Sequence, residues 1–169
     1  MDLHLHQRRA ARLQRARAPQ VGEAAMILGY AGLLPQVAAV AITVFDPRLG
    51  LGAMFAFGYA ALILSFLGGI WWGFAMQAAH GEVEDRGQGR IAGLAVAPPL
   101  VASALILLTI CRVLPVGWAL VLMGVALFLT LRVDRWLATT GVAPKGWLAM
   151  RGPLSIGLGL LTIACGLVA

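Results

Sequence analysis

The sequence predicts an all-α integral membrane protein, a helical bundle of five transmembrane helices with the N-terminus in the cytoplasm and the C-terminus outside. Of its 169 residues 60% are hydrophobic and 12% are charged, whereas a soluble domain has about 45 to 50% apolar and about 25% charged residues. Five long stretches also lack charge, and Lys and Arg gather in alternate connections. We divide the chain into a basic arm, residues 1–22, and one five-span domain, residues 23–169.

The expected spans follow the charge-free stretches, because a helix needs about 20 mainly apolar residues to cross roughly 30 Å of hydrocarbon. They cover residues 24–45, 53–79, 91–111, 113–131 and 152–169. Pro153 would lie in the first turn of the last span, where its missing N–H costs no helical hydrogen bond. Pro35 and the Pro98–Pro99 pair lie inside spans, and the carbonyls that they free need other donors.

The basic residues predict the orientation. Eleven of the thirteen Lys and Arg lie in the N-terminal arm, residues 80–90 and residues 132–151, and only Arg48 and Arg112 lie in the alternate connections. By the positive-inside rule the first group faces the cytoplasm. We expect a bacterial inner membrane, or the mitochondrial inner membrane in a eukaryote. Four tryptophans near the same interface indicate an aromatic belt: Trp71, Trp72, Trp136 and Trp147.

The arm carries five arginines, Arg8, Arg9, Arg12, Arg15 and Arg17. We expect it to lie on anionic lipid headgroups, where each basic residue contributes about 1 kcal/mol. Docking to a partner protein is the alternative. Because most basic residues flank apolar spans, membrane orientation explains them and we expect no nucleic-acid partner.

Small residues at regular spacing predict where the helices pack, because close approach drives helix association in lipid. In the second span Ala61, Ser65, Gly69 and Gly73 recur every four residues and form the expected helix-packing motif. The first and last spans carry stripes with steps of three and four: Gly29, Gly32, Gln36, Ala39 and Thr43, and Gly152, Ser155, Gly159, Thr162 and Gly166.

Gln36 is the most polar side chain near mid-membrane. It could line a small polar cavity with Tyr30 and Tyr59, or it could make a single interhelical hydrogen bond.

Asp134 and Arg151 flank the last cytoplasmic connection. We expect an ion pair at the headgroup boundary, where partial exposure keeps the coupling on the order of 1 kcal/mol. A site for an anionic lipid or a partner is the alternative.

Catalytic patterns are missing from the sequence. The centres of the predicted spans contain no ionisable residue, which argues against proton or cation pumping. The three histidines are not paired at helical spacing, and there is no Cys-x-x-Cys, phosphate-binding glycine loop or Gly-x-Ser-x-Gly. We therefore expect no enzyme activity, no cofactor and no metal.

Four segments carry a resemblance: residues 28–35, residues 61–73, Asp134–Arg135 and residues 147–151. They resemble a family of small five-span membrane proteins that is a domain of unknown function, similar to the mitochondrial group called transmembrane protein sixty-nine. The resemblance covers residues 28–169 and implies the fold and topology, but no reaction. Members of that family often carry a polar or basic residue where this chain has Trp71, which implies that a site role at this position would be lost.

The sequence favours an accessory or assembly component of a larger membrane complex, with the bilayer, its anionic headgroups and other membrane subunits as partners. The alternative is a small carrier or channel for a neutral or lipidic solute. A water-filled cavity that reaches Gln36 would favour the carrier, and a dry, filled bundle would favour the accessory role.

Overall fold

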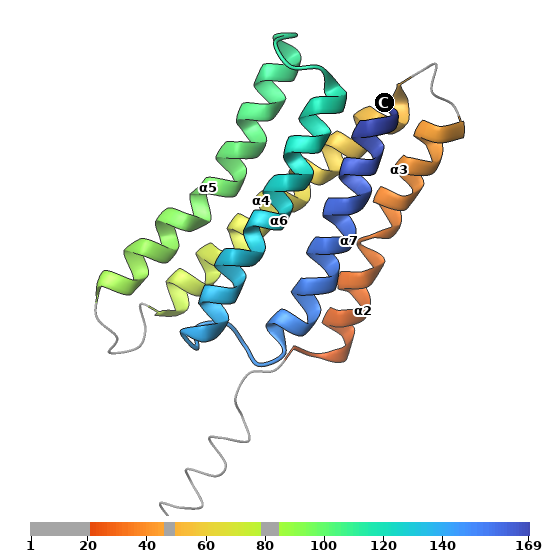
Figure 1. Cartoon of the computed structure of the whole chain (residues 1–169). Helices are drawn as coiled ribbons and strands as arrows, with labels where there is room; N and C mark the ends of the chain where they lie inside the picture. The colour runs from red at the N-terminus through yellow and green to blue at the C-terminus, as the bar shows by residue number, and fades with distance from the viewer. Residues whose placement is uncertain (1–20, 46–49, 79–84) are drawn as a thin grey trace, which may run out of the picture.

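The computed structural model describes residues 21–45, 50–78 and 85–169, which form a helical bundle (Figure 1). Five spans in these ranges are long and apolar enough to cross a membrane, and the described ranges contain no strand. The predicted all-α bundle of five spans is therefore confirmed. The arginines of the arm lie outside the described residues. The helices are α2 (Glu23–Ala31), α3 (Leu34–Phe45), α4 (Leu51–Ala78), α5 (Asp85–Ile110), α6 (Val116–Thr139) and α7 (Trp147–Val168).

Several helices extend beyond the expected spans. Helix α5 begins at Asp85 rather than at Ile91, and α6 continues past Leu131 to Thr139. Helix α7 begins at Trp147, so Pro153 lies inside it and not in its first turn. Charge-free stretches mark the hydrocarbon-crossing part of a helix, whereas the helical backbone can continue beyond it into the headgroup region.

The first span is broken into α2 and α3. Pro35 has no N–H to donate to the carbonyl of Ala31, which favours a break at this point. The Tyr59 hydroxyl of α4 donates a hydrogen bond to the carbonyl of Gly32 in the break. A side chain from a neighbouring helix therefore satisfies a backbone group that the break exposes, as a lipid environment requires.

Helix α4 crosses the middle of the bundle and contacts α3, α5, α6 and α7. Helix α6 packs most extensively against α7, whereas α2 contributes no buried residue. In Figure 1 the start of α2, the end of α4, the start of α5, the end of α6 and the start of α7 lie at one end of the bundle, called the arm end below. The C-terminus lies at the opposite end.

Glycines bring α6 and α7 together. A Cβ atom on Gly124 would lie 2.8 Å from the carbonyl oxygen of Gly159, and one on Gly166 would lie 2.5 Å from that of Gly117. Ser155, Gly159 and Thr162 of the last-span stripe are also buried. The sequence therefore identified a real packing face on α7.

The helix-packing motif expected on α4 is wrong at its last two positions. Gly69 and Gly73 are exposed, and a Cβ atom on either would meet nothing within 4 Å. The close contact is at Gly68, where a Cβ atom would lie 2.4 Å from the carbonyl oxygen of Ala95 and 2.8 Å from Cδ of Pro99. At 3.6 residues per turn, each step of four residues rotates about 40° around the helix, so the motif turns about 120° away from buried Ala61 by Gly73.

Replacement of Gly68 by Leu should lower the free energy of unfolding by about 1 to 3 kcal/mol, because the new side chain would overlap α5. The control is Gly69→Leu, which places the same side chain on an open surface and should be nearly neutral. Unfolding of both variants in mixed detergent micelles measures the difference. Equal stability of the two variants would contradict this packing of α4 on α5.

Candidate functional site

The carboxylate of Asp134 is the centre of a buried polar cluster. Its Oδ1 accepts hydrogen bonds from the indole Nε1 of Trp71 at 2.9 Å and of Trp147 at 3.1 Å. Its Oδ2 accepts one from Nε of Arg151 at 3.3 Å. Nη2 of Arg151 in turn donates to Oγ of Ser155 at 2.9 Å. We call these five residues the Asp134 cluster.

The cluster links three helices, since Trp71 comes from α4, Asp134 from α6 and the other three residues from α7. Trp147, Arg151 and Ser155 follow at steps of four residues, which places neighbours on the same side of the helix. The guanidinium carbon of Arg151 also lies 5.9 Å from the Trp147 ring centroid, within the range of a cation–π contact. Trp147 and Arg151 therefore both reach Asp134 from one side of α7.

The predicted ion pair between Asp134 and Arg151 is confirmed, but its expected exposure is wrong. The side chains are 0% and 8% exposed. Removal of each ion from water costs several kcal/mol, and only good geometry with further hydrogen bonds compensates for it. The two indoles and Ser155 supply those bonds, so the cluster is more strongly coupled than the exposed pair that the sequence suggested.

Two of the tryptophans expected in the aromatic belt, Trp71 and Trp147, are buried in the interior. Trp71 is 2% exposed, whereas its neighbour Trp72 is 47% exposed. The resemblance implied that a site role at position 71 would be lost. Trp71 nevertheless takes part in the cluster, because its indole donates a hydrogen bond to Asp134. A sequence signal was available: Asp134 is the only acidic residue in α4, α6 and α7, and a buried indole N–H needs an acceptor.

Gln36, Tyr30 and Tyr59 do not form the polar cavity that was one expectation. Gln36 is fully buried, and its Nε2 donates to Oγ1 of Thr162 at 3.0 Å. Tyr59 bonds the break near α2, and Tyr30 is exposed. The alternative, an interhelical hydrogen bond of Gln36, is therefore confirmed. A small apolar pocket of about 200 Å³ does lie at Pro98, between α4, α5 and α6, but Gln36 does not line it.

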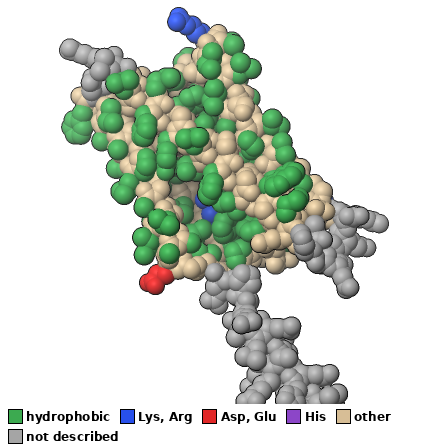
Figure 2. All heavy atoms as spheres, turned by 180° about the vertical axis from the view of Figure 1, so that it is seen from behind, with side chains coloured by type: hydrophobic (Ala, Val, Ile, Leu, Met, Phe, Trp, Pro, Cys, Tyr) green, Lys and Arg blue, Asp and Glu red, His purple; other side chains and the backbone are tan. Residues whose placement is uncertain are grey.

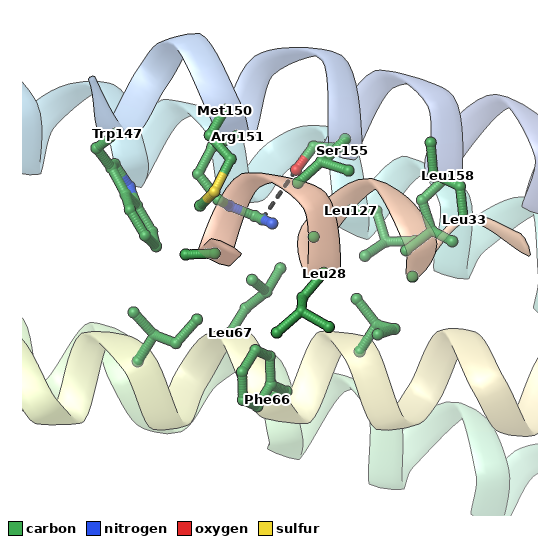
Figure 3. A pocket seen from close by; sticks show the side chains of 16 residues that line it. Leu28, Leu33, Phe66, Leu67, Leu127, Trp147, Met150, Arg151, Ser155 and Leu158 are labelled. Carbon is green, nitrogen blue, oxygen red and sulfur yellow. Dashed lines mark hydrogen bonds between the residues drawn. The ribbon is translucent and has the colours of Figure 1, made fainter. Parts of the chain in front are cut away.

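A larger pocket of about 350 Å³ lies between α2, α4 and α7. Figure 3 shows Leu28 and Phe66 on one side of this pocket and Arg151 with Ser155 on the other. Leu28 and Phe66 are 72% and 64% exposed on the outside of the bundle, so the pocket opens at the side of the bundle. We call it the side pocket.

Arg151 is the one charged residue that lines the side pocket. Asp134 is fully buried and does not line it, so the guanidinium faces the pocket with its counterion behind it. Figure 2 shows blue atoms of a basic side chain recessed in a hollow of an otherwise mostly apolar face. An apolar pocket with one recessed cation suits a ligand with an apolar body and an oxygen-bearing end. In residues 21–45, 50–78 and 85–169 no three metal-ligating side chains gather.

The chain belongs to the family described as Protein of unknown function (DUF3429), which it matches over residues 21–167. This match confirms the resemblance to an uncharacterised family, while the similarity to a mitochondrial group stays a prediction. No curated protein and no solved structure matches the chain.

Replacement of Trp71 by Phe should lower the free energy of unfolding by about 1.5 to 3 kcal/mol, because it removes a hydrogen bond to a buried charge. Trp72→Phe is the matched control and should change stability little, since Trp72 lies at the surface. Thermal unfolding of the two variants in detergent measures both effects. A Trp71→Phe variant as stable as Trp72→Phe would rule out this role of the indole.

Proposed function

We propose that this protein is a non-catalytic membrane protein that holds a lipidic ligand in its side pocket. The observation that carries the proposal is the lateral opening of an apolar pocket beside a recessed Arg151. The expected alternative, a carrier for a lipidic solute, shares this binding step. It does not use the cavity expected at Gln36, because Gln36 is fully buried and its Nε2 donates to Thr162.

The helix that forms the outer wall of the pocket supports ligand entry from the bilayer. Helix α2 contributes no buried residue and contacts mainly α7. Segments with few buried contacts open at low free energy. Displacement of α2 therefore breaks few contacts and widens the path between Leu28 and Phe66.

We propose that the arm end faces the cytoplasm in a bacterial inner membrane, or the matrix if the membrane is the mitochondrial inner membrane. Exposed Arg132, Arg135 and Lys145 lie at or near the arm end, whereas Arg112 lies at the other. This asymmetry supports the orientation by the positive-inside rule.

An accessory role in a larger complex is the second candidate. The observation that favours it is the open outer strip of α4, where Gly69 and Gly73 leave room for a transmembrane helix of another subunit. If the protein is such a subunit, Gly69→Leu should release the partner on a native gel while the chain itself stays folded. An unchanged complex would count against this candidate.

A pocket-filling variant tests ligand binding. Ile63 lines the side pocket, whereas its neighbour Leu62 is exposed on the bilayer side. After purification and reloading with total membrane lipid, native mass spectrometry should find a bound molecule on the wild type and on Leu62→Trp. Ile63→Trp should retain at least about tenfold less, which corresponds to about 1.4 kcal/mol of binding free energy. Equal retention by all three proteins would contradict the proposed function.

Labelling tests the orientation. Cys111 is exposed beyond the end of α5, and Thr140 is exposed beyond the end of α6, at the arm end. A membrane-impermeant maleimide should label Cys111 in intact cells. In a Cys111→Ser background, Thr140→Cys should react only after the membrane is opened. The reverse pattern would contradict the proposed topology.

A further inference from the structure

We infer that the ligand of the side pocket is a single-chain carboxylic acid, bound through its carboxylate by Arg151 and Ser155. This inference rests on the proposed function and adds the chemical class of the ligand. It follows from three observations: the direction of the ion pair, the hydrogen-bond donors left over at Arg151 and Ser155, and the size of the pocket.

The ion pair presents its positive side to the pocket. The Asp134 carboxylate is enclosed by two indoles and the guanidinium, and it does not line the pocket. Arg151 does line it. A ligand in the pocket therefore meets the cation at short range and the anion only behind it, which favours an oxygen anion over a neutral or cationic head.

Both polar side chains keep donors for such a head. A guanidinium has five N–H donors, and among the described residues Arg151 donates through Nε to Asp134 and through Nη2 to Ser155. The Nη1 group makes no hydrogen bond to any described residue. Ser155 accepts from Arg151 through Oγ, so its own O–H can donate to a second ligand oxygen. A carboxylate offers two oxygens in one plane, which matches a guanidinium and a neighbouring hydroxyl.

The charge count favours a monoanion. Arg151 and Asp134 together carry no net charge, so every negative charge on the ligand adds to the charge buried at the site. A phosphate monoester carries about −1.5 to −2 at neutral pH. A carboxylate carries a single charge and is therefore less costly to bury.

The volume of the side pocket favours a ligand with one acyl chain. About 350 Å³ lies at the small end of ligand pockets, which span about 300 to 1,000 Å³. The wall beside Arg151 is apolar, with Leu67, Leu154 and Leu158 along it. An acyl chain can lie against these residues and leave between Leu28 and Phe66 into the lipid.

The test compares two ligands on the wild-type protein. They share the same acyl chain and differ only in the head group. Purified, delipidated protein in detergent is titrated with palmitate and with methyl palmitate, and native mass spectrometry measures occupancy. Palmitate should bind at least about tenfold more tightly than its ester, because only the acid places an anion on Arg151. Ser155→Ala should weaken palmitate binding several-fold and leave the ester unchanged. It is preferred to Arg151→Met, which would also leave Asp134 unpaired and endanger folding.

The outcomes separate the two proposals. Equal binding of acid and ester, both abolished in Ile63→Trp, would overturn the carboxylate inference and leave the lipidic pocket in place. Stronger binding of hexadecyl phosphate than of palmitate would likewise overturn the carboxylate. If neither palmitate nor its ester binds, the inference fails, and retention of total lipid by the wild type but not by Ile63→Trp then decides separately whether the proposed function stands.

Discussion

The carboxylate of Asp134 is a charge that the bundle has removed from water, and the arrangement of α4, α6 and α7 follows from the donors that it requires. Without Trp71, Trp147 and Arg151 an isolated ion in this position would cost several kcal/mol. The donors hold two helices relative to Asp134. Trp71 fixes the rotation of α4, and Trp147 with Arg151 fixes α7 against α6. The glycine contacts between α6 and α7 continue the same interface toward the other end of the bundle.

The same interaction links the architecture to the proposed site. Because Asp134 holds Nε of Arg151, the rest of the guanidinium is directed toward the side pocket, where Ser155 holds Nη2. Trp147 packs beside it and lines the pocket as well. In the proposed function Arg151 therefore serves both the structural ion pair and the ligand, and α2 closes the opposite wall with few contacts of its own.

Much of the fold follows from local sequence, because span length and loop charge act within single segments. The Asp134–Arg151 pair was also predictable, since two opposite charges flank one short connection. Its burial was not, because it depends on Trp71 from a distant helix. The packing face of α4 was misplaced for a geometric reason: the steps of exactly four residues from Ala61 to Gly73 drift around the helix, whereas the mixed steps on α7 do not. The side pocket was beyond prediction, since α2, α4 and α7 meet only in the folded bundle.

A double-mutant cycle on Asp134→Asn and Arg151→Met measures the central interaction most directly. The Asn side chain keeps an oxygen for the two indoles, so the cycle isolates the ion pair. Each single variant should lose about 3 to 5 kcal/mol of unfolding free energy, because each leaves a buried charged or polar partner without its match. The double variant should be more stable than the sum of the two losses implies by at least about 2 kcal/mol. Additive losses would contradict the account, since they would mean that Asp134 and Arg151 contribute to the bundle independently.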